Sequence, residues 1–225
     1  APLMHESYGD HTLILFRHPI PQSISCLRND WELNYRPFLG SKWYVESYLG
    51  GGLEGYCWDI LRSGRALDKY VLVWCLENRP LHGYLSDYPQ WSFVSYERFV
   101  EDTAAVIGAW SRSYDLPQLD AMLRAAKQPS VSTRKLSKAA AKSAIRNADK
   151  ANVLFAWRSR IAAEDERRLM AIVERFEIDE YTPFETTSKI GFRAPATEGL
   201  ALPAGSPSRP AAAIGDEPAS LPQGT

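Results

Sequence analysis

The sequence predicts an α/β fold in which helices flank a parallel sheet. Two short segments, residues 12–16 and 91–96, have the length and the β-branched or aromatic content of strands. Segments with helical periodicity lie between and after them, and strands that alternate with helices favour a parallel sheet. The chain has 225 residues, of which 45% are hydrophobic and 24% charged, as in ordinary globular proteins.

The two strands differ in their patterns. Residues 12–16, Thr-Leu-Ile-Leu-Phe, form a continuous apolar run, which is typical of a strand buried on both faces. Residues 91–96 follow a turn at Pro89 and alternate apolar with polar side chains. Two strands are too few for a complete sheet, so we expect its remaining strands to lie upstream of Ala1.

Several helices are expected around these strands. After the first strand, Pro21 suits the start of a helix whose apolar face carries Ile24, Leu27 and Trp31. Residues 34–65 hold many aromatic residues among glycines without a regular period, so we expect an irregular insertion near a binding surface. Further helical patterns cover residues 67–88 with a break at Pro80, 99–110, 118–127, 139–150 and 157–176, and residues 128–138 predict a loop.

A change in composition marks the end of the folded part. Residues 194–225 are rich in Ala, Pro, Gly and Ser and contain no aromatic residue. Such a segment buries too little apolar area to offset its ordering entropy. We therefore expect one α/β domain over residues 1–193 and a disordered tail over 194–225.

Composition also excludes several classes. A net charge of −1 and interleaved charges give no basic patch, so no nucleic-acid partner is expected. No apolar run approaches the roughly 20 residues of a membrane span. Three cysteines without a Cys-x-x-Cys pair favour a reducing compartment, and we expect the cytoplasm. The four histidines lack metal-ligand spacing, so we expect no metal and place them on the surface or in turns.

Two motifs have plainer interpretations than the chemistry they suggest. Residues 50–55 match the Gly-x-Gly-x-x-Gly spacing of dinucleotide sites, with Asp68 where a ribose-binding acid could lie. No buried apolar strand precedes them, so we expect a flexible turn. Residues 164–168, Glu-Asp-Glu-Arg-Arg, lie on a helix whose other face is apolar, and we expect a solvated face.

The strongest candidate site follows the first strand. Arg17 comes at the carboxyl end of that strand, and Ser25 lies in the helix that begins after a short turn. A guanidinium can hold a phosphate through two charge-assisted hydrogen bonds, and the helix N-terminus and a hydroxyl can add donors. An arginine that simply pairs with a carboxylate is an equally good interpretation of this spacing.

At these residues the chain resembles the PAPS-dependent sulfotransferases, and in particular the bacterial-type domain. Arg17, Pro19 and Ser25 match the spacing of that family's 3′-phosphate motif, whereas Pro21 stands where an Asp is usual. The resemblance implies a P-loop-NTPase-like layered fold, incomplete at its amino end, in which Arg17 and Ser25 hold the 3′-phosphate of the nucleotide. PAPS, 3′-phosphoadenosine 5′-phosphosulfate, would be the co-substrate.

Two later segments extend the resemblance. Tyr96, in Tyr-Glu-Arg-Phe after the second strand, is similar to the family's Tyr-Glu-Asp motif, whose tyrosine lies near the adenine. A core tyrosine that ends a strand is the alternative. Arg134 and Lys135 resemble the loop that closes over the 3′-phosphate, although Leu136 replaces the usual Gly. A solvated basic loop is the alternative there.

The resemblance implies transfer of a sulfuryl group from PAPS to a hydroxyl or amine of a small-molecule, carbohydrate or lipid acceptor. The chain lacks the family's Pro-Lys-Ser-Gly-Thr-type loop for the 5′-phosphosulfate, and no catalytic base can be assigned. We therefore expect it to correspond to the carboxyl-terminal two-thirds of such an enzyme. The alternatives are a non-catalytic nucleotide-binding module and a helical interaction module. The sequence predicts no oligomeric state.

Overall fold

The computed structural model describes residues 12–81, 88, 91–126, 154–185, 188–189 and 192–193. Its sheet contains strands β1 (Leu13–Phe16), β2 (Ser92–Ser95) and β3 (Phe192–Arg193), in the order β1-β2-β3. β1 and β2 are parallel, and β3 pairs antiparallel with β2. The described part is mostly helical, and an α/β class with a small parallel pair of strands holds. Both predicted strands are confirmed.

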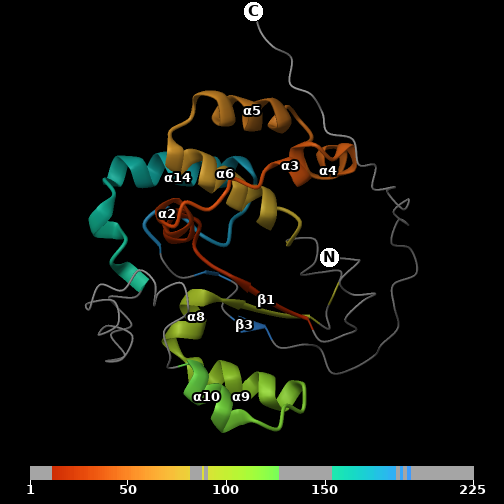
Figure 1. The fold of residues 1–225 in the computed structure, drawn as a ribbon, viewed down its shortest axis with the longest axis vertical. Helices are drawn as coiled ribbons and strands as arrows, with labels where there is room; N and C mark the ends of the chain where they lie inside the picture. The colour runs from red at the N-terminus through yellow and green to blue at the C-terminus, as the bar shows by residue number, and fades with distance from the viewer. Residues whose placement is uncertain are drawn as a thin grey trace, which may run out of the picture.

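Helices lie on both sides of the sheet, as Figure 1 shows. Phe93 of β2 belongs to the larger apolar core, which it shares with helices α2 (Pro19–Arg28), α6 (Ala66–Asn78) and α14 (Ala163–Arg175). The next residue, Val94, belongs to a second core with α9 (Thr103–Ser113) and α10 (Leu119–Ala126). Successive side chains of a strand point to opposite faces, so β2 separates the two layers.

The expectation that β1 is buried on both faces is wrong for two of its leucines. Leu13 is 40% exposed and Leu15 is 54% exposed, whereas Phe16 is buried. Leu15 pairs with Val94, so these leucines face the side of the sheet on which α9 and α10 lie. That smaller core includes Val94 but neither leucine, because its helices cover β2 and not β1.

Helix α2 begins earlier and buries a different face than its apolar spacing indicates. Pro19 occupies its first position, and the buried residues are Pro19, Ile20, Pro21 and Ser23. Leu27 and Trp31 are exposed, and Trp31 lies beyond the end of the helix. The predicted stripe is confirmed for Ile24, which packs against the larger core, and is wrong for Leu27 and Trp31, because the amino-terminal half of α2 makes most of the contact with the core.

Residues 34–65 are helical, which corrects the expectation of an irregular insertion. They form α3 (Arg36–Leu39), α4 (Lys42–Tyr48) and α5 (Leu53–Ser63). The turn expected at the glycines is confirmed: Gly51 and Gly52, with φ of 69° and 83°, join α4 to α5. Left-handed backbone of this kind favours glycine. α6 then ends at Asn78, before the predicted break at Pro80.

The helix expected after β2 is divided into two. α8 (Tyr96–Glu101) ends at Asp102, whose carboxylate accepts a hydrogen bond from the Ala105 amide at 3.2 Å and so caps α9. α10 confirms the helix predicted over residues 118–127. The helix predicted over 157–176 begins later, at Ala163, after the 3₁₀ turn η1 (Arg158–Arg160).

Two predicted segments, the loop at 128–138 and the helix at 139–150, lie outside the described residues, as does the tail at 194–225. In the part of the chain that the structure covers, no helix combines the length and the apolar character needed to cross a membrane. The longest of them, α6 and α14, have 13 residues each.

Candidate functional site

The carboxyl ends of β1 and β2 bring Arg17 and Tyr96 together. The strands are parallel, and their last residues, Phe16 and Ser95, are paired in the sheet. Arg17 directly follows β1 and Tyr96 directly follows β2. The guanidinium carbon of Arg17 lies 4.4 Å from the centre of the Tyr96 ring. Two residues that the sequence assigns to one site are thus in contact. This edge of an open α/β sheet is also where such folds bind ligands.

The Arg17 guanidinium is held in place but makes no ion pair with any described residue. Its backbone carbonyl accepts a hydrogen bond from the Trp74 indole at 3.0 Å, and Tyr96 supports the cation from one side. Its Nε is buried and has no hydrogen-bond partner. The Nε atoms of Arg158 and Arg168 are also buried without a partner, so the feature particular to Arg17 is its place beside Tyr96 at the sheet edge with no ion-pair partner among the described residues. A guanidinium without a carboxylate partner can hold an anion through charge-assisted hydrogen bonds. The alternative of an arginine paired with a carboxylate is not observed among the described residues.

Ser25 lies in the second turn of α2, half-buried. Its backbone carbonyl accepts a hydrogen bond from the Asn29 side chain at 2.7 Å. Burial and the charge of Glu77 raise the pKa of the neighbouring Cys26, and the charge of Arg17 opposes that rise, so this turn of α2 lies within electrostatic range of the guanidinium. The other two predicted site residues, Arg134 and Lys135, lie outside the described residues.

The amino terminus of α2 offers no backbone donor in its first turn, contrary to the expectation of an amide pocket. Pro19 and Pro21 have no N–H group. The amide of Ile20 donates to the Nδ1 atom of His18 at 3.3 Å, and the amide of Gln22 donates to the His18 carbonyl at 3.3 Å. An anion at this edge of the sheet would therefore depend on side-chain donors, with Arg17 first among them.

His18 lies in the turn between β1 and α2, as one of the two expected placements has it, but it is buried and not on the surface. Because Nδ1 accepts from Ile20, the ring proton is on Nε2, which donates to the Glu185 carbonyl at 3.1 Å. The ring packs against Trp157 and Tyr181, with centroid separations of 5.0 and 4.9 Å. Burial, assisted by the charges of Arg158 and Arg17, lowers the pKa of His18 to about 3. It is a neutral structural cap.

Glu97 is a buried carboxylate beside this site, and the sequence assigns it no role. Its Oε1 accepts a hydrogen bond from the His18 amide at 3.0 Å, and its Oε2 accepts one from the Tyr181 hydroxyl at 2.8 Å. Burial raises the pKa of Glu97, and these two donors and the charge of Arg17 oppose that rise. Burial and the Glu97 charge also raise the pKa of Tyr181, which keeps its proton.

Sequence separation explains why these partners were missed. Glu97 is 79 residues from His18 and 84 from Tyr181, so no local spacing connects them. One signal was present for His18: it directly precedes Pro19 at the start of a helix, where residues with a side-chain acceptor commonly cap the first amides. Glu97 lies in the Tyr-Glu-Arg-Phe segment that the sequence singles out, but nothing local indicates its burial or its contact with Tyr181.

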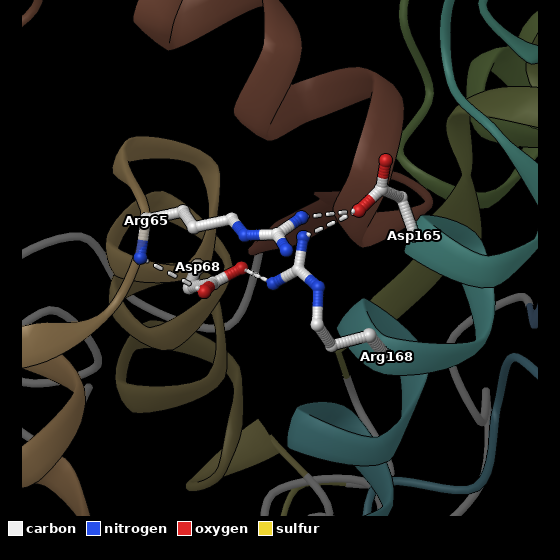
Figure 2. A network of polar contacts seen from close by, with 4 residues as sticks. All are labelled: Arg65, Asp68, Asp165 and Arg168. Carbon is white, nitrogen blue, oxygen red and sulfur yellow. Dashed lines mark hydrogen bonds and ion pairs between the residues drawn. The ribbon is translucent and has the colours of Figure 1, made fainter.

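A second polar cluster, drawn in Figure 2, is structural. Arg65 and Arg168 both contact Oδ1 of Asp165, at 2.8 and 3.0 Å, and Arg168 also pairs with Asp68. Asp68 accepts from the Arg65 amide at 3.0 Å and so caps α6. The cluster connects the start of α6 to the start of α14. It also engages Asp68, the acid that could have bound a ribose, in structural contacts.

The charged run at residues 164–168 is therefore only partly solvated, which corrects the expectation for it. Glu166 is buried, and its Oε1 accepts from the Phe184 amide at 3.0 Å and pairs with Arg158 at 3.5 Å. These contacts fix the segment after α14 against the start of that helix. Within the described ranges, no group of His, Cys, Asp and Glu side chains is arranged to hold a metal ion.

Comparisons with known proteins identify no family for this chain. No protein-family model, curated protein or solved structure matches the chain. The function must therefore be argued from the residues at the sheet edge.

Proposed function

We propose that the chain carries the 3′-phosphate-binding part of a PAPS-dependent sulfotransferase with a P-loop-NTPase-like layered fold. The observation that supports this most is the Arg17 guanidinium, which rests on Tyr96 at the carboxyl edge of two parallel strands with a buried Nε that has no partner. A ligand that carries both an anionic group and an aromatic ring would suit this arrangement, with the anion beside Arg17 and the ring near Tyr96. The motif of Arg17, Pro19 and Ser25 identifies the anion we propose, the 3′-phosphate of adenosine 3′,5′-bisphosphate.

In this proposal each residue has a binding role. Arg17 donates charge-assisted hydrogen bonds to the phosphate, Ser25 adds a hydroxyl donor, and the ring of Tyr96 lies near the adenine. Arg134 and Lys135 would supply further donors. PAPS, when bound, would supply the sulfuryl group, which passes to a hydroxyl or amine of a small-molecule, carbohydrate or lipid acceptor. The described residues position the nucleotide, and no acid or base is assigned among them.

The proposal includes a reducing compartment, and we propose the cytoplasm. All three cysteines are free. Cys57 and Cys75 are buried, and burial raises the pKa of both thiols, Cys57 to about 12. A raised thiol pKa lowers reactivity towards oxidants, so these two side chains act as small apolar groups in the core.

Calorimetric titration with adenosine 3′,5′-bisphosphate tests the binding role. Arg17→Ala should lose on the order of 1.5–3 kcal/mol, roughly 10- to 150-fold in affinity, because charge-assisted hydrogen bonds are lost. Ser25→Ala should lose less. The affinity for adenosine 5′-monophosphate, which has no 3′-phosphate, should change little in Arg17→Ala. The control Arg62→Ala, on the exposed face of α5, should leave the affinities for both nucleotides unchanged. Equal affinity of the wild type and Arg17→Ala for the bisphosphate would remove Arg17 from the site.

A helical interaction module is the second candidate, and one observation favours it. Trp31, Trp43 and Trp58 are exposed by 57%, 44% and 38%. Large exposed aromatic side chains are common at binding surfaces. The same titration separates the candidates, because an interaction module would show no preference for the bisphosphate over the monophosphate.

A further inference from the structure

We propose that Glu97 is a positioning residue that fixes the Arg17 guanidinium for a nucleotide 3′-phosphate through the His18 amide. This inference rests on the proposed function and adds a residue to it. Glu97 is buried, with an exposed fraction of 3%. No proposed ligand contact involves it.

The first step of the argument is the backbone that carries Arg17. The Glu97 Oε1 atom accepts from the amide of His18, the residue that follows Arg17, at 3.0 Å. Glu97 itself follows Tyr96, on whose ring the guanidinium lies at 4.4 Å. One carboxylate therefore connects the two chain segments that meet in the candidate site. Removing it would free the turn after β1 from the start of α8.

The second step is the orientation of the carboxylate. Its Oε2 accepts from the Tyr181 hydroxyl at 2.8 Å, and the Tyr181 ring packs edge-on against Phe16, His18 and Trp74. Glu97 is thus engaged at both oxygens. Although it lies within electrostatic range of Arg17, it forms no ion pair with that guanidinium, and the Nε atom of Arg17 has no hydrogen-bond partner among the described residues.

Nucleotide binding by Glu97 variants tests the inference. Glu97→Ala should weaken binding of adenosine 3′,5′-bisphosphate by roughly tenfold, which is typical of residues coupled in one network, and that of adenosine 5′-monophosphate by less than about twofold. Glu97→Gln keeps an oxygen that can accept from His18, so its affinity should stay within about twofold of the wild type. Glu46→Ala, a change at an exposed carboxylate on α4, serves as the control.

A double-mutant cycle separates positioning from general stability. In the Arg17→Ala background, Glu97→Ala should cause no further loss of bisphosphate affinity, because its effect acts through Arg17. Equal losses for both nucleotides, or additive losses in the cycle, would overturn the positioning role while the Arg17 site stands. If Glu97→Ala does not fold, Glu97→Asp, which keeps the charge but withdraws the oxygens, should show the same selective loss. A wild type without preference for the bisphosphate would overturn this role and the proposed function together.

Discussion

Acidification should destabilise the protein through His18. The unfolded chain binds a proton on this imidazole below about pH 6.5, the ordinary pKa, whereas the folded chain resists protonation until the pH approaches 3. Because the folded pKa is the lower one, the unfolded state binds more protons between these limits. The free energy of unfolding must then fall as the pH falls through this window.

The magnitude follows from the two pKa values. Between pH 7 and pH 5 the folded imidazole stays neutral, while the unfolded one changes from mostly neutral to almost fully protonated. The resulting loss of unfolding free energy is about 2 kcal/mol. With a urea dependence of ~2 kcal/mol per molar, the unfolding midpoint should move down by about 1 M.

Urea titrations of the wild type and of His18→Asn at pH 7 and pH 5 measure this effect. Asparagine can still accept from the Ile20 amide and cap α2, but it has no proton to gain. It should be less stable at pH 7, because the ring contacts are lost, and it should lack the His18 part of the pH dependence. Other titrating groups occur in both proteins and cancel in the difference. If the two proteins lose the same stability between pH 7 and pH 5, the assignment of His18 as a neutral buried cap is refuted.

Two further predictions concern stability, each with its own control and each measured by urea titration at pH 7. Arg168→Ala leaves the buried Asp68 carboxylate with the Arg65 amide but without its ion-pair partner and should cost about 1–3 kcal/mol, whereas the exposed Arg62→Ala should cost less than about 0.5 kcal/mol. Gly52→Ala, at a φ of 83°, should cost about 1 kcal/mol, whereas Gly55→Ala, inside α5 with open space around it, should gain up to about 1 kcal/mol. A pair whose two members respond equally would contradict the corresponding argument.

Sequence patterns were sufficient to predict those elements whose conformation depends mainly on the residues within them. The two strands were predicted from short apolar runs, and the contact of Arg17 with Tyr96 follows from the rule that parallel strands end at the same edge. The helices within residues 34–65 could not be predicted in this way. Aromatic residues have only moderate helix propensity, and α3 and α4 are too short to show a clear period, so tertiary packing decides their conformation.

The buried polar groups of the site illustrate the same limit. A histidine or glutamate in a sequence is normally exposed, and burial of either requires partners that are distant in the chain. For His18 the distant partner is the Glu185 carbonyl, and for Glu97 it is the Tyr181 hydroxyl. Arg17 and Tyr96, which lie together at the sheet edge, could therefore be named from the sequence, whereas the buried partners beside them needed the structure.

The central strand β2 contributes to both apolar cores, which affects how the protein unfolds. Phe93 and Val94 are consecutive residues, yet each belongs to a different apolar core. If β2 leaves the sheet, the larger core loses Phe93 and the smaller core loses Val94 at the same moment. The backbone amides of this strand should then exchange with solvent only in the cooperative event that opens the entire described domain.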